Sequence, residues 1–153
     1  MLETPHVVVG AAIAFKVGNP ALALPLALGS HFILEKIPHW NPHLNTEKKN
    51  HGKITSQTTA IVVADSLLSL LLGTLIAFQA YPDLTKVAIV LLGAFLAALP
   101  DLIEAPYFFL NQKSAFIFKW IKFKKSLQAN AEMFPGLVYQ FLTVVAAFWW
   151  VFG

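Results

Sequence analysis

Long apolar runs separated by short polar breaks dominate the chain, at residues 5–17, 21–37, 56–80, 84–99 and 135–152. An α-helix rises 1.5 Å per residue, so crossing a hydrocarbon core of about 30 Å takes about 20 residues. The run at 56–80 alone meets that length with residues to spare, and the other runs are shorter but mainly apolar. The pattern predicts an all-α, polytopic integral membrane protein with about five membrane helices.

The breaks between the runs predict how consecutive helices are joined. Gly18-Asn19-Pro20 interrupts the first two runs, which are each shorter than about 20 residues, and we expect a short or tilted helical hairpin there. The stretch 81–83, Tyr-Pro-Asp, is a tight turn between the third and fourth runs. Pro100 ends the fourth helix at Leu99, because proline disfavours helical geometry in the residue before it.

Composition supports the membrane assignment. Hydrophobic residues make up 57% of the 153 residues and charged residues 12%, with a mean hydropathy of +0.64, whereas soluble domains carry about 25% charged residues. We expect one transmembrane domain over 1–153, with a polar cytoplasmic loop at 38–55 and a basic amphipathic segment at 113–128. The chain has no cysteine, which excludes disulfides, thiolate catalysis and cysteine metal sites.

The lysines predict the orientation. All eleven basic residues are lysines, and nine of them lie within 36–53 and 113–125. The positive-inside rule places both connections, and with them the N-terminus, in the cytoplasm of what we expect to be a prokaryotic inner membrane. Glu3 stands where a signal peptide would carry positive charge, so we expect no cleaved leader.

Metal-type ligands gather at helix ends that this orientation brings to one side of the membrane. His31 and Glu35 are four residues apart and share a helix face if the helix persists. A cluster of histidines and carboxylates without sulfur suits Zn²⁺, Mn²⁺ or Fe better than Mg²⁺. The sequence therefore predicts a divalent metal site on the cytoplasmic side, with the ligands His6, His31, Glu35, His39 and Asp101.

Two further carboxylates are candidates for catalysis. Asp65 lies ten residues into the third run, and ionisable residues inside membrane helices are usually functional. Glu104 lies three residues after Asp101, on the same face if the helix continues. Either carboxylate, left free of the metal, can accept a proton from an attacking water.

Each of these features also has a plain structural explanation. Asp65 can form a helix-to-helix hydrogen bond with a serine or threonine, and His6 can be an interfacial residue at a helix start. His31 and Glu35 can form a simple pair at a helix end. The acids of 100–104 can be solvated residues at a helix stop.

The basic segment 113–128 alternates lysines with aromatic residues. Such a composition is typical of a segment that lies on an anionic membrane face, and also of lysines that only set the topology. Nucleic acid is not expected as a partner, since no binding module is visible. We expect the bilayer and anionic lipid headgroups as partners, with four lysines holding a substrate headgroup: Lys119, Lys122, Lys124 and Lys125.

Three motifs resemble a known family: PHVVVGAAIA (5–14), SHFILEKIPH (30–39) and LPDLIE (99–104). Together they are similar to the small membrane-bound metal-dependent hydrolases of the DUF457 type, in which an aspartate stands at the place of Glu35. The resemblance implies that four residues are metal ligands and that a fifth is a further ligand or the general base: His6, His31, Glu35 and Asp101, with Glu104 as the fifth.

These observations predict a membrane-embedded metal-dependent hydrolase that acts on a lipid-like or phosphate-containing substrate at the cytoplasmic interface. The alternative is a non-enzymatic small transporter, or an ion- or metal-binding membrane protein, in which Asp65 and the histidines form an ion or proton site. A scaffold protein would leave the polar cluster without a role. A CDP-alcohol phosphotransferase is disfavoured because its aspartate-rich signature is absent.

Overall fold

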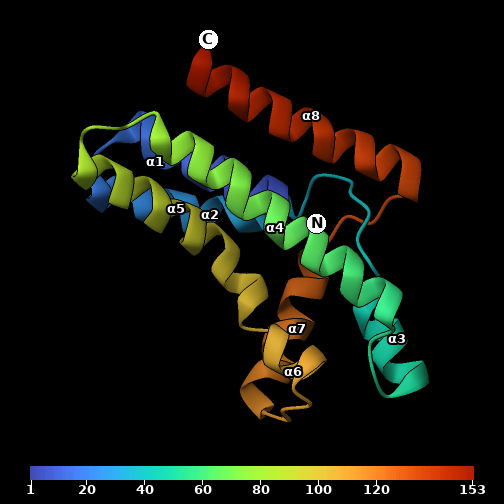
Figure 1. Cartoon of the computed structure of the whole chain (residues 1–153). Coiled ribbons are helices and arrows are strands. Elements are labelled where there is room, and N and C mark those ends of the chain that lie inside the picture. The colour runs from blue at the N-terminus through green and yellow to red at the C-terminus, as the bar shows by residue number, and fades with distance from the viewer.

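The computed structural model describes residues 1–153 and is all-helical, which confirms the predicted fold class (Figure 1). Its only strand-type contact is an isolated parallel bridge between His39 and Asn130. The helices, in chain order, are α1 (Glu3–Val17), α2 (Pro20–Leu34), α3 (Leu44–His51), α4 (Ser56–Phe78), α5 (Leu84–Leu102), α6 (Ala105–Phe109), α7 (Ala115–Leu127) and α8 (Met133–Phe152).

Three helices, α4, α5 and α8, are long and apolar enough to cross a membrane. Their outward side chains suit a bilayer, since Leu67 and Leu70 of α4 and Phe141 of α8 are 62%, 66% and 66% exposed. The five membrane helices expected from the sequence are not confirmed. α1 and α2 have 15 residues each, about 22 Å of helix, which falls short of a hydrocarbon core.

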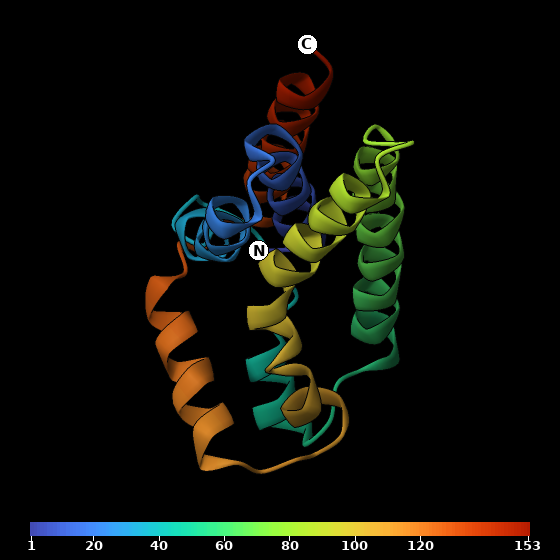
Figure 2. The same cartoon turned by 90° about the vertical axis from the view of Figure 1, so that its left-hand side faces the viewer.

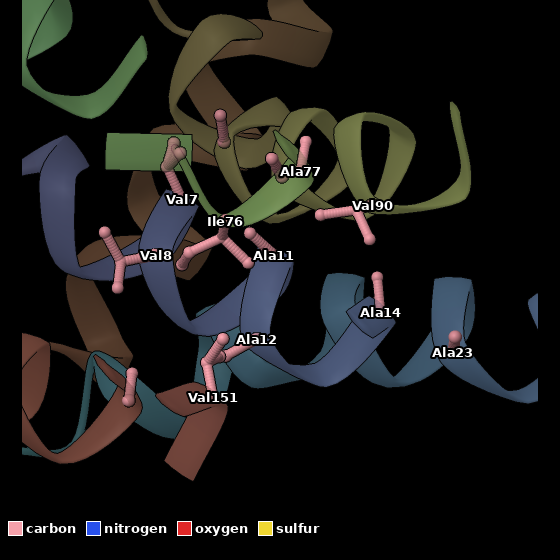
Figure 3. Packing of buried hydrophobic residues seen from close by; sticks show 13 residues of the cluster. Val7, Val8, Ala11, Ala12, Ala14, Ala23, Ile76, Ala77, Val90 and Val151 are labelled. Atoms are coloured by element: carbon pink, nitrogen blue, oxygen red, sulfur yellow. The ribbon is translucent and has the colours of Figure 1, made fainter. Parts of the chain in front are cut away.

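α1 is the central helix of the bundle and packs against α2, α4, α5 and α8. The core around it consists mainly of alanine and valine, with Ile76 of α4 pointing toward Ala11 and Val8 (Figure 3). α1 and α5 approach especially closely: a Cβ built on Gly10 would lie 2.7 Å from the carbonyl oxygen of Gly93. Gly10 also faces Ala97, and Ala14 faces Gly93, so the two helices run antiparallel and the start of α1 lies beside the end of α5.

The end of α5 differs from the sequence prediction. Pro100 lies inside the helix, which continues to Leu102 instead of ending at Leu99. Proline removes one backbone donor and crowds the preceding turn, and at this position little helix follows it. The carbonyl oxygen of Pro100 accepts a hydrogen bond of 2.9 Å from Nε1 of Trp120, which ties α7 to this last turn.

A smaller group of helices, α3, α6 and α7, lies at one end of the bundle, seen at the bottom of Figure 2. Phe108 of α6 packs with Ile117 and Ile121 of α7 in a second, separate core. The loop predicted at 38–55 thus contains a helix, α3, and the amphipathic segment forms the helix α7. The boundary between this group and the bundle is where the polar side chains meet.

Candidate metal centre

His6 and His31 form the centre of the polar cluster. The two rings stack with their centroids 3.9 Å apart and their planes 20° apart. Both residues are completely buried, at 0% exposure. His6 is held there by the first turn of α1 and His31 by the last turn of α2, because the α1–α2 hairpin brings these two ends together.

Each ring uses one nitrogen as a hydrogen-bond donor. Nδ1 of His31 lies 2.8 Å from the carbonyl oxygen of Ala97, and Nε2 of His6 lies 3.3 Å from Oε1 of Glu35. A carbonyl or an ionised carboxylate only accepts, so these nitrogens carry the protons. The remaining nitrogens, Nε2 of His31 and Nδ1 of His6, are buried with no hydrogen-bond partner. A metal ligand needs such a lone pair.

Asp101 completes a three-residue group. Each of His6, His31 and Asp101 offers one ligand atom, and these three atoms lie within 4.8 Å of one another. The three residues can therefore hold a metal ion. The donor set of two imidazoles and one carboxylate occurs in catalytic zinc sites and in non-haem iron sites. The buried lone pairs of the histidines fit such an ion, since an unpartnered buried polar atom is costly.

Lys124 lies on the other side of Asp101. Its ammonium group contacts Oδ1 of Asp101 and lies 3.5 Å from Oε1 of Glu104. The lysine side chain is only 2% exposed, because it occupies the buried face of α7 with Ile117 and Ile121. Burial opposes its charge, but the two carboxylates together raise the pKa of Lys124. Lys124 would therefore compete with a bound metal ion for the charge of Asp101.

Glu104 follows the end of α5 and lies beside this pair. Burial, with the charge of Asp101, raises its pKa to about 7, although Lys124 opposes that shift. Its atom Oε1 is buried and forms no hydrogen bond. Together with Asp101 it lines a cavity of about 490 Å³ that borders the candidate metal centre.

Glu35 lies behind His6, outside the three-residue group. Its Oε1 accepts hydrogen bonds from His6 and, at 2.7 Å, from the amino group of Met1. Burial opposes ionisation, but the His6 hydrogen bond and the Met1 charge hold the pKa of Glu35 far below its usual range. The structure thus gives this predicted ligand the position of a residue that orients a histidine.

His39 adjoins Glu35, with Nε2 3.9 Å from Oε2 of the carboxylate. Its Nδ1 donates to the carbonyl oxygen of Ile37 at 2.7 Å, and burial lowers the pKa of the ring. The backbone of His39 is bonded to Ala129 and Ala131, which fixes this segment against the chain after α7. His39 is therefore a neighbour of the three-residue group through Glu35.

Asp65 is engaged at the start of α1. Its carboxylate accepts hydrogen bonds from the backbone N–H groups of Glu3 and Thr4, at 2.5 and 3.3 Å, and from the Thr4 hydroxyl at 2.6 Å. A carboxylate at this position caps the helix and interacts favourably with its dipole. The helix-to-helix hydrogen bond between Asp65 and a threonine, expected as the structural explanation, is observed.

The four lysines predicted to hold a headgroup have three different environments. Lys119 and Lys122 are exposed on the outside of α7, whereas Lys124 is buried against Asp101. Lys125 is exposed and also lines the cavity. Only Lys125 is therefore in a position to contact a group bound there.

Sequence reasoning missed the role of Gln140. Its side chain is 3% exposed and joins two segments: Oε1 accepts from the N–H of Leu2, and Nε2 donates to the carbonyl oxygen of Trp40, both at 2.8 Å. A polar residue within an apolar span is the signal that could have revealed it. Gln140 thereby fixes Leu2 and Trp40, whose chain neighbours Met1 and His39 both contact Glu35.

Comparison of the chain with protein-family models, with curated proteins and with solved structures finds no match.

Proposed function

We propose that this chain is a membrane-embedded, metal-dependent hydrolase that acts on a lipid-like or phosphate-containing substrate at the cytoplasmic interface. The observation that carries the proposal is the pair of buried, unpartnered nitrogens on His6 and His31 beside Asp101. Each histidine has its other nitrogen bound to an acceptor, the arrangement found in metal sites whose ligands are oriented in advance. The motif resemblance to the DUF457-type hydrolases supports the same reading.

In this proposal His6, His31 and Asp101 hold the ion, and Glu35 orients His6. A bound divalent metal would polarise the scissile bond and lower the pKa of water to about 7. Glu104, which lines the cavity beside Asp101, would accept the proton of the attacking water. Lys124 would hold both carboxylates in place and would stabilise negative charge that develops on the substrate.

The donor set favours Zn²⁺, Mn²⁺ or Fe over Mg²⁺, because Mg²⁺ prefers oxygen ligands and keeps several waters. We also propose that the N-terminus and the site lie at the cytoplasmic face of a prokaryotic inner membrane. This orientation is supported by the concentration of lysines in the connecting segments 36–53 and 113–125.

The first test is the metal content of detergent-purified protein, measured by mass spectrometry. Wild type is compared with His31→Ala and Asp101→Ala, and with His51→Ala as a control, because His51 is an exposed histidine at the end of α3. We expect stoichiometric metal in wild type and in the control, and loss in the other two variants. Wild type that binds no metal after reconstitution would refute the proposal. A phosphoester and lipid hydrolysis screen on metal-loaded protein then tests the reaction.

One observation favours the alternative, a non-enzymatic ion or proton site. Buried titratable groups form a continuous line from Glu35 through His6, His31 and Asp101 to Lys124. If that line is the function, liposomes containing the protein should show ion or proton flux that His31→Ala abolishes, with no hydrolysis. Asp65 is not part of this line, since its carboxylate caps α1.

A further inference from the structure

The cavity beside the candidate metal centre is bordered by two membrane spans, together with the start of the chain, residues 41–46 and α6. α4 and α5 pack together near the turn that joins them, where Ile76 and Ala77 meet Val90 in the main core. Toward the opposite end the two helices diverge, as Figure 2 shows in green and yellow. The cavity occupies this end and is lined by Val62 and Ser66 of α4 and by Leu102 of α5, among others.

Part of the lining is apolar and exposed. Leu102 is 46% exposed and Phe109, after the short helix α6, is 39% exposed, and both border the cavity. On α4 the neighbouring residues Val63 and Leu67 are 51% and 62% exposed. The rim of the cavity is thus continuous with the apolar surface of a membrane span. In a bilayer such a rim contacts acyl chains instead of water.

Among the charged side chains that line the cavity, carboxylates outnumber lysines. Four carboxyl groups line it, and Lys125 is the only lysine among the lining residues. Asp65 and Asp101 have hydrogen-bond or ion-pair partners, as described above. Oε1 of Glu3 is buried and forms no hydrogen bond, and Oε1 of Glu104 also forms none but lies 3.5 Å from the ammonium group of Lys124. These two oxygens are acceptors, so the complementary group is a cationic donor such as a primary ammonium.

We propose that this cavity binds a phospholipid whose headgroup carries a primary ammonium, and that the lipid enters sideways from the bilayer between α4 and α5. The ammonium lies toward Glu3 and Glu104, the phosphate toward Lys125, and the acyl chains pass over Leu102 and Phe109. That this lipid is the substrate rests on the proposed hydrolase function. That the cavity binds the lipid does not depend on any hydrolysis.

The test is lipid retention by the full-length protein in mixed micelles that contain equal amounts of phosphatidylethanolamine, phosphatidylcholine and phosphatidylglycerol, followed by native mass spectrometry. We expect wild type to retain phosphatidylethanolamine roughly tenfold in preference to the other two. Ser66→Trp fills the cavity and should abolish retention. Leu67→Trp, the adjacent residue on the outer face of α4, should retain lipid as wild type does.

Two further arms identify the recognised group. Glu3→Gln removes one carboxylate and should bring retention of phosphatidylethanolamine close to that of phosphatidylcholine, whose trimethylammonium donates no hydrogen bond. Soluble phosphoethanolamine in excess should not displace the lipid if the apolar rim contributes as proposed. Displacement would instead assign the cavity to a free headgroup.

Equal retention of all three lipids, or equal retention by Ser66→Trp and Leu67→Trp, would overturn the lipid assignment. Metal content measured on the same samples separates this result from the proposed function. Protein that holds metal but no phosphatidylethanolamine refutes the lipid inference alone. Protein that holds the lipid but no metal refutes the metal-dependent hydrolase alone.

Discussion

Glu35 accepts the hydrogen bond of His6 Nε2 at 3.3 Å, and this contact determines which nitrogen of His6 is free. The proton stays on Nε2 because the buried carboxylate is ionised. Nδ1 is then the nitrogen that remains for a metal ion. Glu35, outside the three-residue group, thus determines which nitrogen of His6 could bind an ion.

The first prediction follows from this contact. Glu35→Gln should lower metal affinity by roughly 10- to 100-fold, the usual cost of removing a partner that orients a ligand histidine. Titration against a chelator of known affinity measures the change. Glu132→Gln, an exposed position at the start of α8, serves as the control and should match wild type. Unchanged affinity in Glu35→Gln would show that Glu35 does not orient His6.

The second prediction concerns the competition between Lys124 and a metal ion. Lys124→Met leaves Asp101 and Glu104 without their buried cation, and metal-free protein should lose about 3 kcal/mol of stability. Added metal should restore more stability to the variant than it gives wild type, because the ion then replaces the lysine charge.

Thermal unfolding in detergent, with and without metal, measures both effects. Lys122→Met, on the exposed side of the same helix, is the matched control and should change neither value. A variant that gains no more from metal than wild type would contradict the competition.

The third prediction separates capping by Asp65 from catalysis. Asn caps a helix about as well as Asp, whereas Ala does not. Asp65→Asn should therefore leave unfolding temperature and hydrolysis close to wild type, and Asp65→Ala should cost about 1 kcal/mol while metal content is unchanged. If Asp65→Asn keeps its stability but loses hydrolysis, Asp65 takes part in the reaction.

The fourth prediction is a pH dependence at the α3–α4 connection. Hydrogen bonds from Thr58 and Thr55 lower the pKa of Glu47 from 4.5. Because the folded-state pKa is lowered, the stabilisation is present above about pH 4.5 and is lost as the pH falls through the folded value.

Intrinsic amide exchange slows as the pH falls, so exchange at the start of α4 should slow less than the intrinsic rate does, which is a loss of protection in acid. Glu47→Gln should exchange faster than wild type at pH 7 and show no such loss of protection in acid. Identical profiles for the two proteins would remove Glu47 from this contact.

The long helices could be predicted from sequence because their apolar length alone identifies them. α3 could not, since its eight residues, LNTEKKNH, have no apolar periodicity. Tertiary contacts define it: Lys48 donates to the carbonyl oxygen of Phe108 at 3.1 Å, and Glu47 accepts from Thr58. The structure does not confirm α1 and α2 as membrane helices, and hydropathy cannot reveal that α1 is enclosed by its neighbours.

The convergence of His6, His31 and Asp101 could be predicted because all three lie at helix ends that the order of the helices brings to one end of the bundle. The roles of Glu35 and Lys124 could not, because they depend on helix rotation and on the direction of each side chain. Lys124 in particular belongs to a lysine-rich helix, and only the packing of Ile117 and Ile121 turns it inward.

The close approach of Gly10 and Gly93 has a consequence for the candidate metal centre. Gly10 lies one turn after His6, and Ala97 lies one turn before Asp101. A Cβ added to Gly10 would also meet the Cβ of Ala97. A single added methyl group would push α1 away from α5 and widen the gap between those two ligands. The distance between His6 and Asp101 is therefore set by Gly10 and Gly93, which have no side chains of their own.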